Sequence, residues 1–160
     1  MEPISFFVPC VPKPAGSKRA FAIKKGGAFT GRSSIVDASG QKGKDWRGDV
    51  KRFASDAYNG QLITGPVTAT FVFRFQRPLS HYGTGKKAHV LKPTAPRHHV
   101  QAPDALKLAR GVEDALTGTV WKDDAQVVAH DGLSKGWCGP DERPGVSIVI
   151  TPVVDQEGLI

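Results

Sequence analysis

The sequence is poor in cysteine, in methionine and in long apolar runs. Its 160 residues include two Cys and one Met, and Cys10 and Cys138 lack the paired spacing of a zinc site or a disulfide framework. No apolar run approaches the roughly 20 residues of a membrane span, and the first residues lack the basic-then-apolar pattern of a signal peptide. We therefore expect a cytoplasmic protein with two reduced thiols and no membrane partner.

Acidic side chains are scarce in the first hundred residues. Residues 1–100 hold 17 Lys or Arg and 5 Asp or Glu, a net charge of +12, whereas residues 101–160 hold 5 and 10, a net charge of −5. A basic surface beside a few functional carboxylates is typical of proteins that bind a polyanion. The charge therefore favours nucleic acid as a partner, and the alternative is a solvated basic surface.

Hydrophobic periodicity predicts a single α+β domain spanning residues 1–160. Apolar residues recur three to four positions apart over about 46–58 and 103–117, which predicts two helices. Alternation over Val67–Phe75 predicts the strongest strand. Further strands are expected at 4–8, 125–129 and 146–154, a hairpin at 20–30, and loops at 39–44 and 77–100. This order predicts a small mixed β-sheet packed by two or three helices.

The long loop at about 77–100 has no clear periodicity and a basic centre at Lys86-Lys87. A stretch of this length inside a compact domain is usually a functional loop or a disordered one, and both fit contact with DNA. Lys86 and Lys87, together with Lys18 and Arg19 nearer the start of the chain, are therefore candidate DNA contacts.

Three carboxylates are the candidate metal ligands. Asp104 stands at the start of the second predicted helix, and Asp123-Asp124 precede a predicted strand. A helix start and a strand start can lie side by side, and carboxylates that meet there would hold Mg²⁺. On spacing alone the alternatives are a helix cap or a partner of the helix dipole for Asp104, and a turn for the pair. His98 and His99 either contact phosphate, serve as a base, or lie in an exposed loop.

Several motifs together resemble the RusA family of Holliday junction resolvases, which phages often carry. They are APDALKLARGVEDALTG at 102–118, WKDDAQVV at 121–128, VPCVPKP at 8–14 and Pro-Gly-Val at 144–146. The loop RPLSHYGTGK at 77–86 resembles the subset from phages of actinobacteria. The resemblance implies a homodimeric, Mg²⁺-dependent endonuclease for four-way and other branched DNA in recombination and repair. Mn²⁺ would substitute for Mg²⁺, and a phage-encoded member would act in the host cytoplasm.

The resemblance also implies roles for individual residues. The family pattern is Asp-x-Asp-Asn at the helix start, a Lys one turn on, and a later Asp-Asp pair. Asp104 matches the first carboxylate and Asp124 the last, so both would be catalytic and hold the metal, with Asp123 beside them. Arg110 stands where the family has its Lys, and it would serve both catalysis and DNA binding.

The sequence departs from the family pattern at two positions of the helix start. Leu106 replaces the second aspartate, and Lys107, a candidate phosphate contact, replaces the Asn. Glu113 lies about 10 Å beyond Leu106 along the helix, and Asp114 lies about 15 Å beyond Asp104, so neither can take the place of the missing ligand. Two alternatives therefore stay open. One is a junction-binding protein with weak or no cleavage, and the other is a metal nuclease for flaps or other structured nucleic acid.

Overall fold

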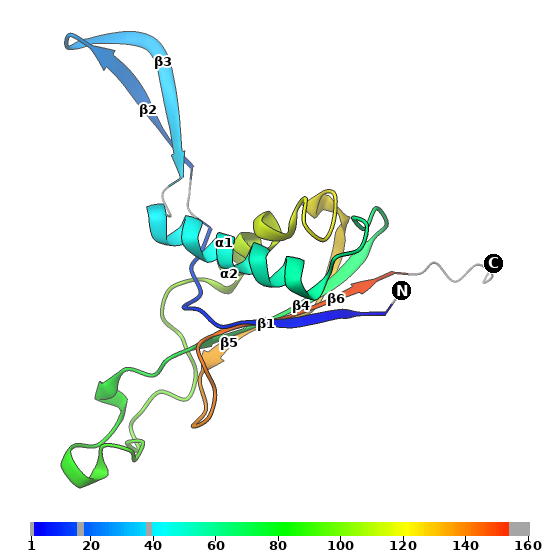
Figure 1. The fold of residues 1–160 in the computed structure, drawn as a ribbon. Coiled ribbons are helices and arrows are strands. Elements are labelled where there is room, and N and C mark those ends of the chain that lie inside the picture. Colours follow the sequence, from blue (N-terminus) through cyan, green and yellow to red (C-terminus); the bar gives the residue numbers. More distant parts are fainter. Residues whose placement is uncertain (1, 16–17, 38–39, 154–160) are drawn as a thin grey trace.

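A computed structural model describes residues 2–15, 18–37 and 40–153 of the chain. A mixed four-stranded sheet carries two helices on one face (Figure 1). The strands, in spatial order, are β1 (Ile4–Val8), β6 (Gly145–Pro152), β4 (Val67–Phe75) and β5 (Val127–Trp137). Neighbouring strands are antiparallel except β4 and β5, which are parallel. The helices are α1 (Gly40–Ala57) and α2 (Ala105–Leu116), and β2 (Lys18–Lys25) forms a separate hairpin with β3 (Ala28–Asp37).

The core lies between the helices and the sheet. Every second side chain of β4, from Val67 to Phe75, is buried against the helices, as the period of two along a strand requires. Trp46 and Val50 of α1 and Leu108 of α2 meet them from the other side. Burial of each large apolar side chain stabilises the fold by about 1.5–3 kcal/mol, so this interface supplies the main stability of the domain.

The structure confirms the α+β class, both helices and the strand over Val67–Phe75. The predicted loop at 39–44 is wrong for residues 40–44, which form the start of α1, while Ser39 lies outside the described residues. That first turn is mostly polar and exposed, so no apolar period shows before Trp46. The predicted strand at 125–129 is wrong at both ends, because Ala125 and Gln126 belong to a short 3₁₀ helix, η3 (Asp124–Gln126), and β5 extends to Trp137. As the outermost strand with two bulges, β5 does not alternate between buried and exposed side chains.

The loop at 77–100 is ordered. It contains two short 3₁₀ helices, η1 (Leu79–His81) and η2 (Gly85–Lys87), and a bridge between Tyr82 and Leu91. The guanidinium of Arg77 donates to the Pro96 carbonyl at 2.9 Å. Of the two alternatives for this stretch, the structure therefore shows the ordered loop.

Two further expectations concern the thiols and the membrane. Cys10 and Cys138 are both free, and burial raises the pKa of the Cys10 thiol to about 11. A thiol that stays protonated is a poor nucleophile, which fits the minor structural role expected for it. Among the described residues, no helix has both the length and the apolar character that crossing a membrane requires.

Candidate active site

Asp104 immediately precedes α2 and presents an exposed carboxylate. It occupies the N-cap position with extended backbone, at φ −68° and ψ 143°, but its side chain makes no cap hydrogen bond. Instead, Oδ2 lies 3.5 Å from Lys107 Nζ, and the side chains of Lys107 and Asp104 are 60 % and 69 % exposed. An exposed pair of this kind contributes about 0–1 kcal/mol. The helix-cap alternative therefore does not describe Asp104, whose carboxylate is accessible to a ligand.

A lysine that the sequence pattern did not reveal holds the segment before Asp104. Lys135 of β5 donates through Nζ to the carbonyls of Gln101 at 2.6 Å and Pro103 at 2.8 Å. These charge-assisted bonds tie the end of the long loop to the sheet. Lys135 falls beyond the strand predicted from the sequence, so no local signal marks it.

Asp123 and Asp124 begin the short 3₁₀ helix η3 (Asp124–Gln126) in front of β5. Asp123 Oδ1 accepts from the backbone N–H of Ala125 at 2.9 Å, and the Asp123 N–H donates to Gln126 Oε1 at 2.8 Å. This reciprocal pair is a capping box. The turn alternative is therefore confirmed for Asp123, while Asp124 is exposed beside it.

Asp104 and Asp124 lie at opposite ends of α2. The twelve residues of this helix rise about 18 Å. After the helix ends, Trp121 Nε1–H donates to Thr117 Oγ1 at 3.2 Å, which keeps the segment before η3 at the C-terminal end of α2. β5 then runs back along α2, so that Lys135 reaches Pro103 at the other end. Within one chain, the structure therefore does not bring these two carboxylates together. Among the described residues, no group of three or more His, Cys, Asp or Glu side chains is placed to hold a metal ion.

The remaining candidate contacts are distributed over three parts of the chain. Leu106 and Arg110 are exposed and lie one turn apart on α2, on the same face of the helix. Lys86 and Lys87 are exposed in η2. Lys18 and Arg19 open β2, and their side chains lie outside the described part of the structure.

Residues 12–151 match the family model described as endodeoxyribonuclease RusA, and no curated protein matches the chain. The chain belongs to the RusA family. Membership supports endodeoxyribonuclease activity, in general of the Holliday junction resolvase type, and binding to branched DNA. RusA-family nucleases generally depend on a divalent metal ion. The matched range contains Asp104, Asp124 and the whole basic loop.

The two adjacent histidines of this RusA-family chain have different surroundings. His98 is exposed, as expected for the loop, but His99 is buried, so exposure was the wrong expectation for it. The His99 ring packs between Phe75 and Trp137, with both ring centroids at 4.3 Å. Burial lowers the pKa of His99 below its ordinary value. His99 therefore anchors the end of the basic loop as a neutral aromatic side chain.

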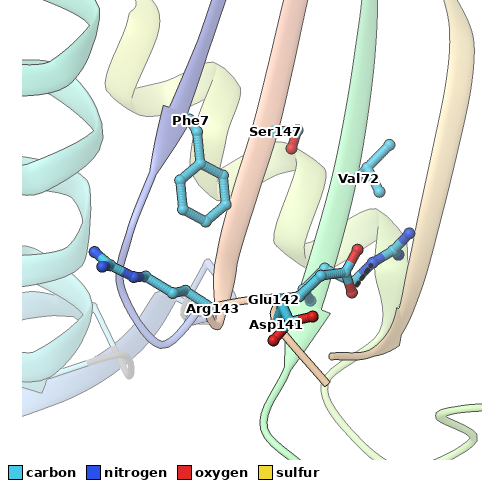
Figure 2. Close-up of a pocket in the computed structure, with 7 residues that line it drawn as sticks. Phe7, Val72, Asp141, Glu142, Arg143 and Ser147 are labelled. Carbon is cyan, nitrogen blue, oxygen red and sulfur yellow. Dashed lines mark ion pairs between the residues drawn. The ribbon is translucent and has the colours of Figure 1, made fainter. Parts of the chain in front are cut away.

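A hollow of about 370 Å³ lies on the face of the sheet that the helices leave open (Figure 2). Phe7 of β1, Ser147 of β6 and Val72 of β4 lie side by side on adjacent strands. At the rim, Arg74 Nε lies 3.3 Å from Glu142 Oε2. The hollow is lined by Phe7, Val72, Arg74, Asp141, Glu142, Arg143 and Ser147. The RusA-family aspartate at 104 belongs to the opposite, helix-covered side of the sheet, so this hollow is separate from the candidate site.

Proposed function

We propose that this RusA-family protein is a Mg²⁺-dependent endonuclease that cuts four-way DNA junctions as a homodimer. The observation that carries the proposal is the family match over residues 12–151, which includes two exposed aspartates at family positions, Asp104 and Asp124. The net charge of +7 supports a polyanionic substrate. Recombination and repair of branched DNA in the cytoplasm is the corresponding biological setting.

The separation of Asp104 from Asp124 determines how such a metal site is assembled. Two carboxylates at opposite ends of a helix that rises about 18 Å cannot share an ion whose oxygen ligands lie at about 2.1 Å. We therefore assign each metal site to Asp104 of one protomer and Asp124 of the partner subunit. A two-fold dimer then has two equivalent sites, matching the two equivalent strands of a four-way junction.

Each side chain has a separate task in this arrangement. Asp104 and Asp124 supply oxygen ligands, which Mg²⁺ and Mn²⁺ prefer. When bound, the ion would polarise the phosphodiester and lower the pKa of the attacking water. Lys107, within 3.5 Å of Asp104, and Arg110 on the same helix bind phosphate oxygens of the substrate strand.

Mixing two inactive variants tests the shared site. Asp104→Asn and Asp124→Asn should each abolish cleavage while preserving junction binding, because each removes a ligand charge and keeps the side-chain shape. When the two variants are co-refolded in equal amounts, half of the dimers contain one protomer of each variant. Each mixed dimer has one intact site. Cleavage should return to about a quarter of the wild-type number of sites, mainly as nicks in one strand.

The control for this experiment is Asp114→Asn, which neutralises an exposed carboxylate elsewhere on α2 and should cleave normally. A mixture that stays inactive, although mixed dimers form, would refute the shared site. Near wild-type cleavage by either single variant would exclude that aspartate as a ligand. Competition among matched junction, flap and duplex substrates decides between a junction enzyme and a nuclease for other structures.

One observation favours the second candidate, a junction-binding protein with little cleavage. Leu106 is 72 % exposed and places an apolar side chain where the family has a carboxylate. Incubation of a synthetic junction with the wild-type protein in Mg²⁺, Mn²⁺ or EDTA separates the two functions. Binding without cleavage in either metal would establish the binding protein.

A further inference from the structure

The positive charge of this protein is concentrated in two projecting segments. The loop at 76–103 contains five Lys or Arg, four of the five His and no Asp or Glu. The hairpin at 18–37 contains five Lys or Arg and one Asp, a net charge of +4. Both segments leave the same end of the body, on either side of the start of α2 (Figure 1).

The segment that leads to the hairpin, described as far as Ala15, lies against the first turn of α2. The N–H of Ala15 donates to the carbonyl of Lys107 at 2.9 Å. A Cβ at Gly111 would lie 3.3 Å from Ala15 N and 3.4 Å from Lys13 O. The segment before the hairpin therefore crosses α2 in close contact, within one turn of Asp104.

The loop at 76–103 is also attached to the body of the protein close to the start of α2. Lys135 binds the carbonyls of Gln101 and Pro103, and His99 is wedged between two aromatic rings. Further out, the Gly83 N–H donates to the Val90 carbonyl at 2.9 Å, which closes the loop on itself. Its tip carries exposed Lys86 and Lys87. The loop is thus a projection held by its own hydrogen bonds, and its base lies beside Asp104.

The length of the hairpin suits a DNA duplex. The eight residues of β2 extend about 26 Å, and a two-stranded ribbon fits the major groove, which is about 12 Å wide. An isolated two-stranded hairpin is only marginally stable in water, so contact with a partner would stabilise it. Phosphates are the partner that this charge attracts most strongly, with release of counterions.

We propose that the β2–β3 hairpin and the 76–103 loop are the two jaws of a clamp on duplex DNA, with Asp104 at its base. The clamp rests on the proposed function, because it names how the nuclease grips one arm of its substrate. A duplex between the jaws has its backbone at the start of α2. There the carboxylate of Asp104 and the ammonium of Lys107 are both exposed.

Paired charge-removal variants test the two jaws separately. Lys24→Ala with Lys25→Ala removes the charge of the hairpin tip, and Lys86→Ala with Lys87→Ala removes that of the loop tip. Binding of a duplex and of a junction is measured by fluorescence anisotropy between about 50 and 200 mM salt. Each double variant should flatten the slope of log K against log salt by about one to two, and the quadruple variant by their sum. The matched control is Lys51→Ala with Arg52→Ala, exposed residues of α1, which should leave the slope unchanged.

Lysine acetylation in the presence and absence of DNA gives a readout that is independent of cleavage. Lys25, Lys86 and Lys87 should be protected by duplex DNA, and Lys51 should not. Protection of one jaw alone, or unchanged slopes in either jaw variant, would overturn the clamp even if the protein cuts junctions. Protection of both jaws in a protein that cuts no junction would support the clamp and overturn the proposed nuclease function.

Discussion

Gly111→Ala tests the close packing of α2 against α1 and against the segment Lys13–Ala15. In the interior of a helix, replacing Gly by Ala normally stabilises a protein by about 0.8–1 kcal/mol. At Gly111, however, an added Cβ would lie 2.9 Å from Trp46 Cζ3, closer than real Cβ atoms approach another heavy atom. Trp46 is only 3 % exposed, so its ring has little room to move. Overpacking of this kind costs about 1–3 kcal/mol, and we expect Gly111→Ala to be neutral to destabilising.

Gly48→Ala is the matched control for this substitution. Gly48 also lies inside a helix, α1, but nothing stands within 4 Å of its added Cβ. Gly48→Ala should therefore keep the full gain in helix propensity. The two variants should differ by about 1–3 kcal/mol in the free energy of unfolding, or by about 2–12 °C in Tm for a protein of this size.

Urea denaturation and differential scanning calorimetry measure both variants. Equal stabilisation by Gly111→Ala and Gly48→Ala would refute the close contact of α2 with α1 and with the segment Lys13–Ala15. Trp46→Phe combined with Gly111→Ala provides a second test, because the smaller ring leaves space for the added methyl group. The double variant should be more stable than the sum of the two single effects predicts.

Two further predictions concern the start of α2 and the anchor of the loop. Leu106→Asp should fold normally, because Leu106 is 72 % exposed. It should cleave DNA at a lower Mg²⁺ concentration than the wild type or the control variant Leu106→Asn. Lower cleavage at every metal concentration would show that the site uses another third ligand. His99→Phe should remove part of the acid sensitivity of folding. Because burial lowers the pKa of His99 in the folded state, the unfolded chain binds more protons, and wild-type stability falls as pH decreases through about 6.5 and below. Urea unfolding of both proteins at pH 5 and 7.5 measures how much the free energy of unfolding falls with pH. If it falls as much in His99→Phe as in the wild type, the buried neutral ring is contradicted.

The two helices and β4 could be predicted because each has one buried face. A half-buried helix repeats its apolar residues with a period near 3.6 and a half-buried strand with a period of two, so burial is visible locally. β5 could not be predicted in full, because an edge strand with bulges has no such period. The start of α1 could not be predicted for the related reason that its first turn is mostly exposed and polar.

The amino-acid sequence by itself determined which side chains are chemically able to form the site. Asp104 immediately precedes the short helix that carries Lys107 and Arg110, where a known rise per residue places the three relative to one another. The charge distribution likewise identifies nucleic acid as the favoured partner, because the net charge of a segment depends on its composition alone.

Only the tertiary structure decided how these groups are combined. The direction in which β5 runs back along α2 places Asp124 at the far end of the helix from Asp104, and it brings Lys135 to Pro103. His99 likewise became a buried anchor through its contacts with Phe75 and Trp137, which are distant in sequence. Helix and strand periodicity depend on neighbours within a few residues, whereas these placements depend on burial between segments that lie far apart along the chain.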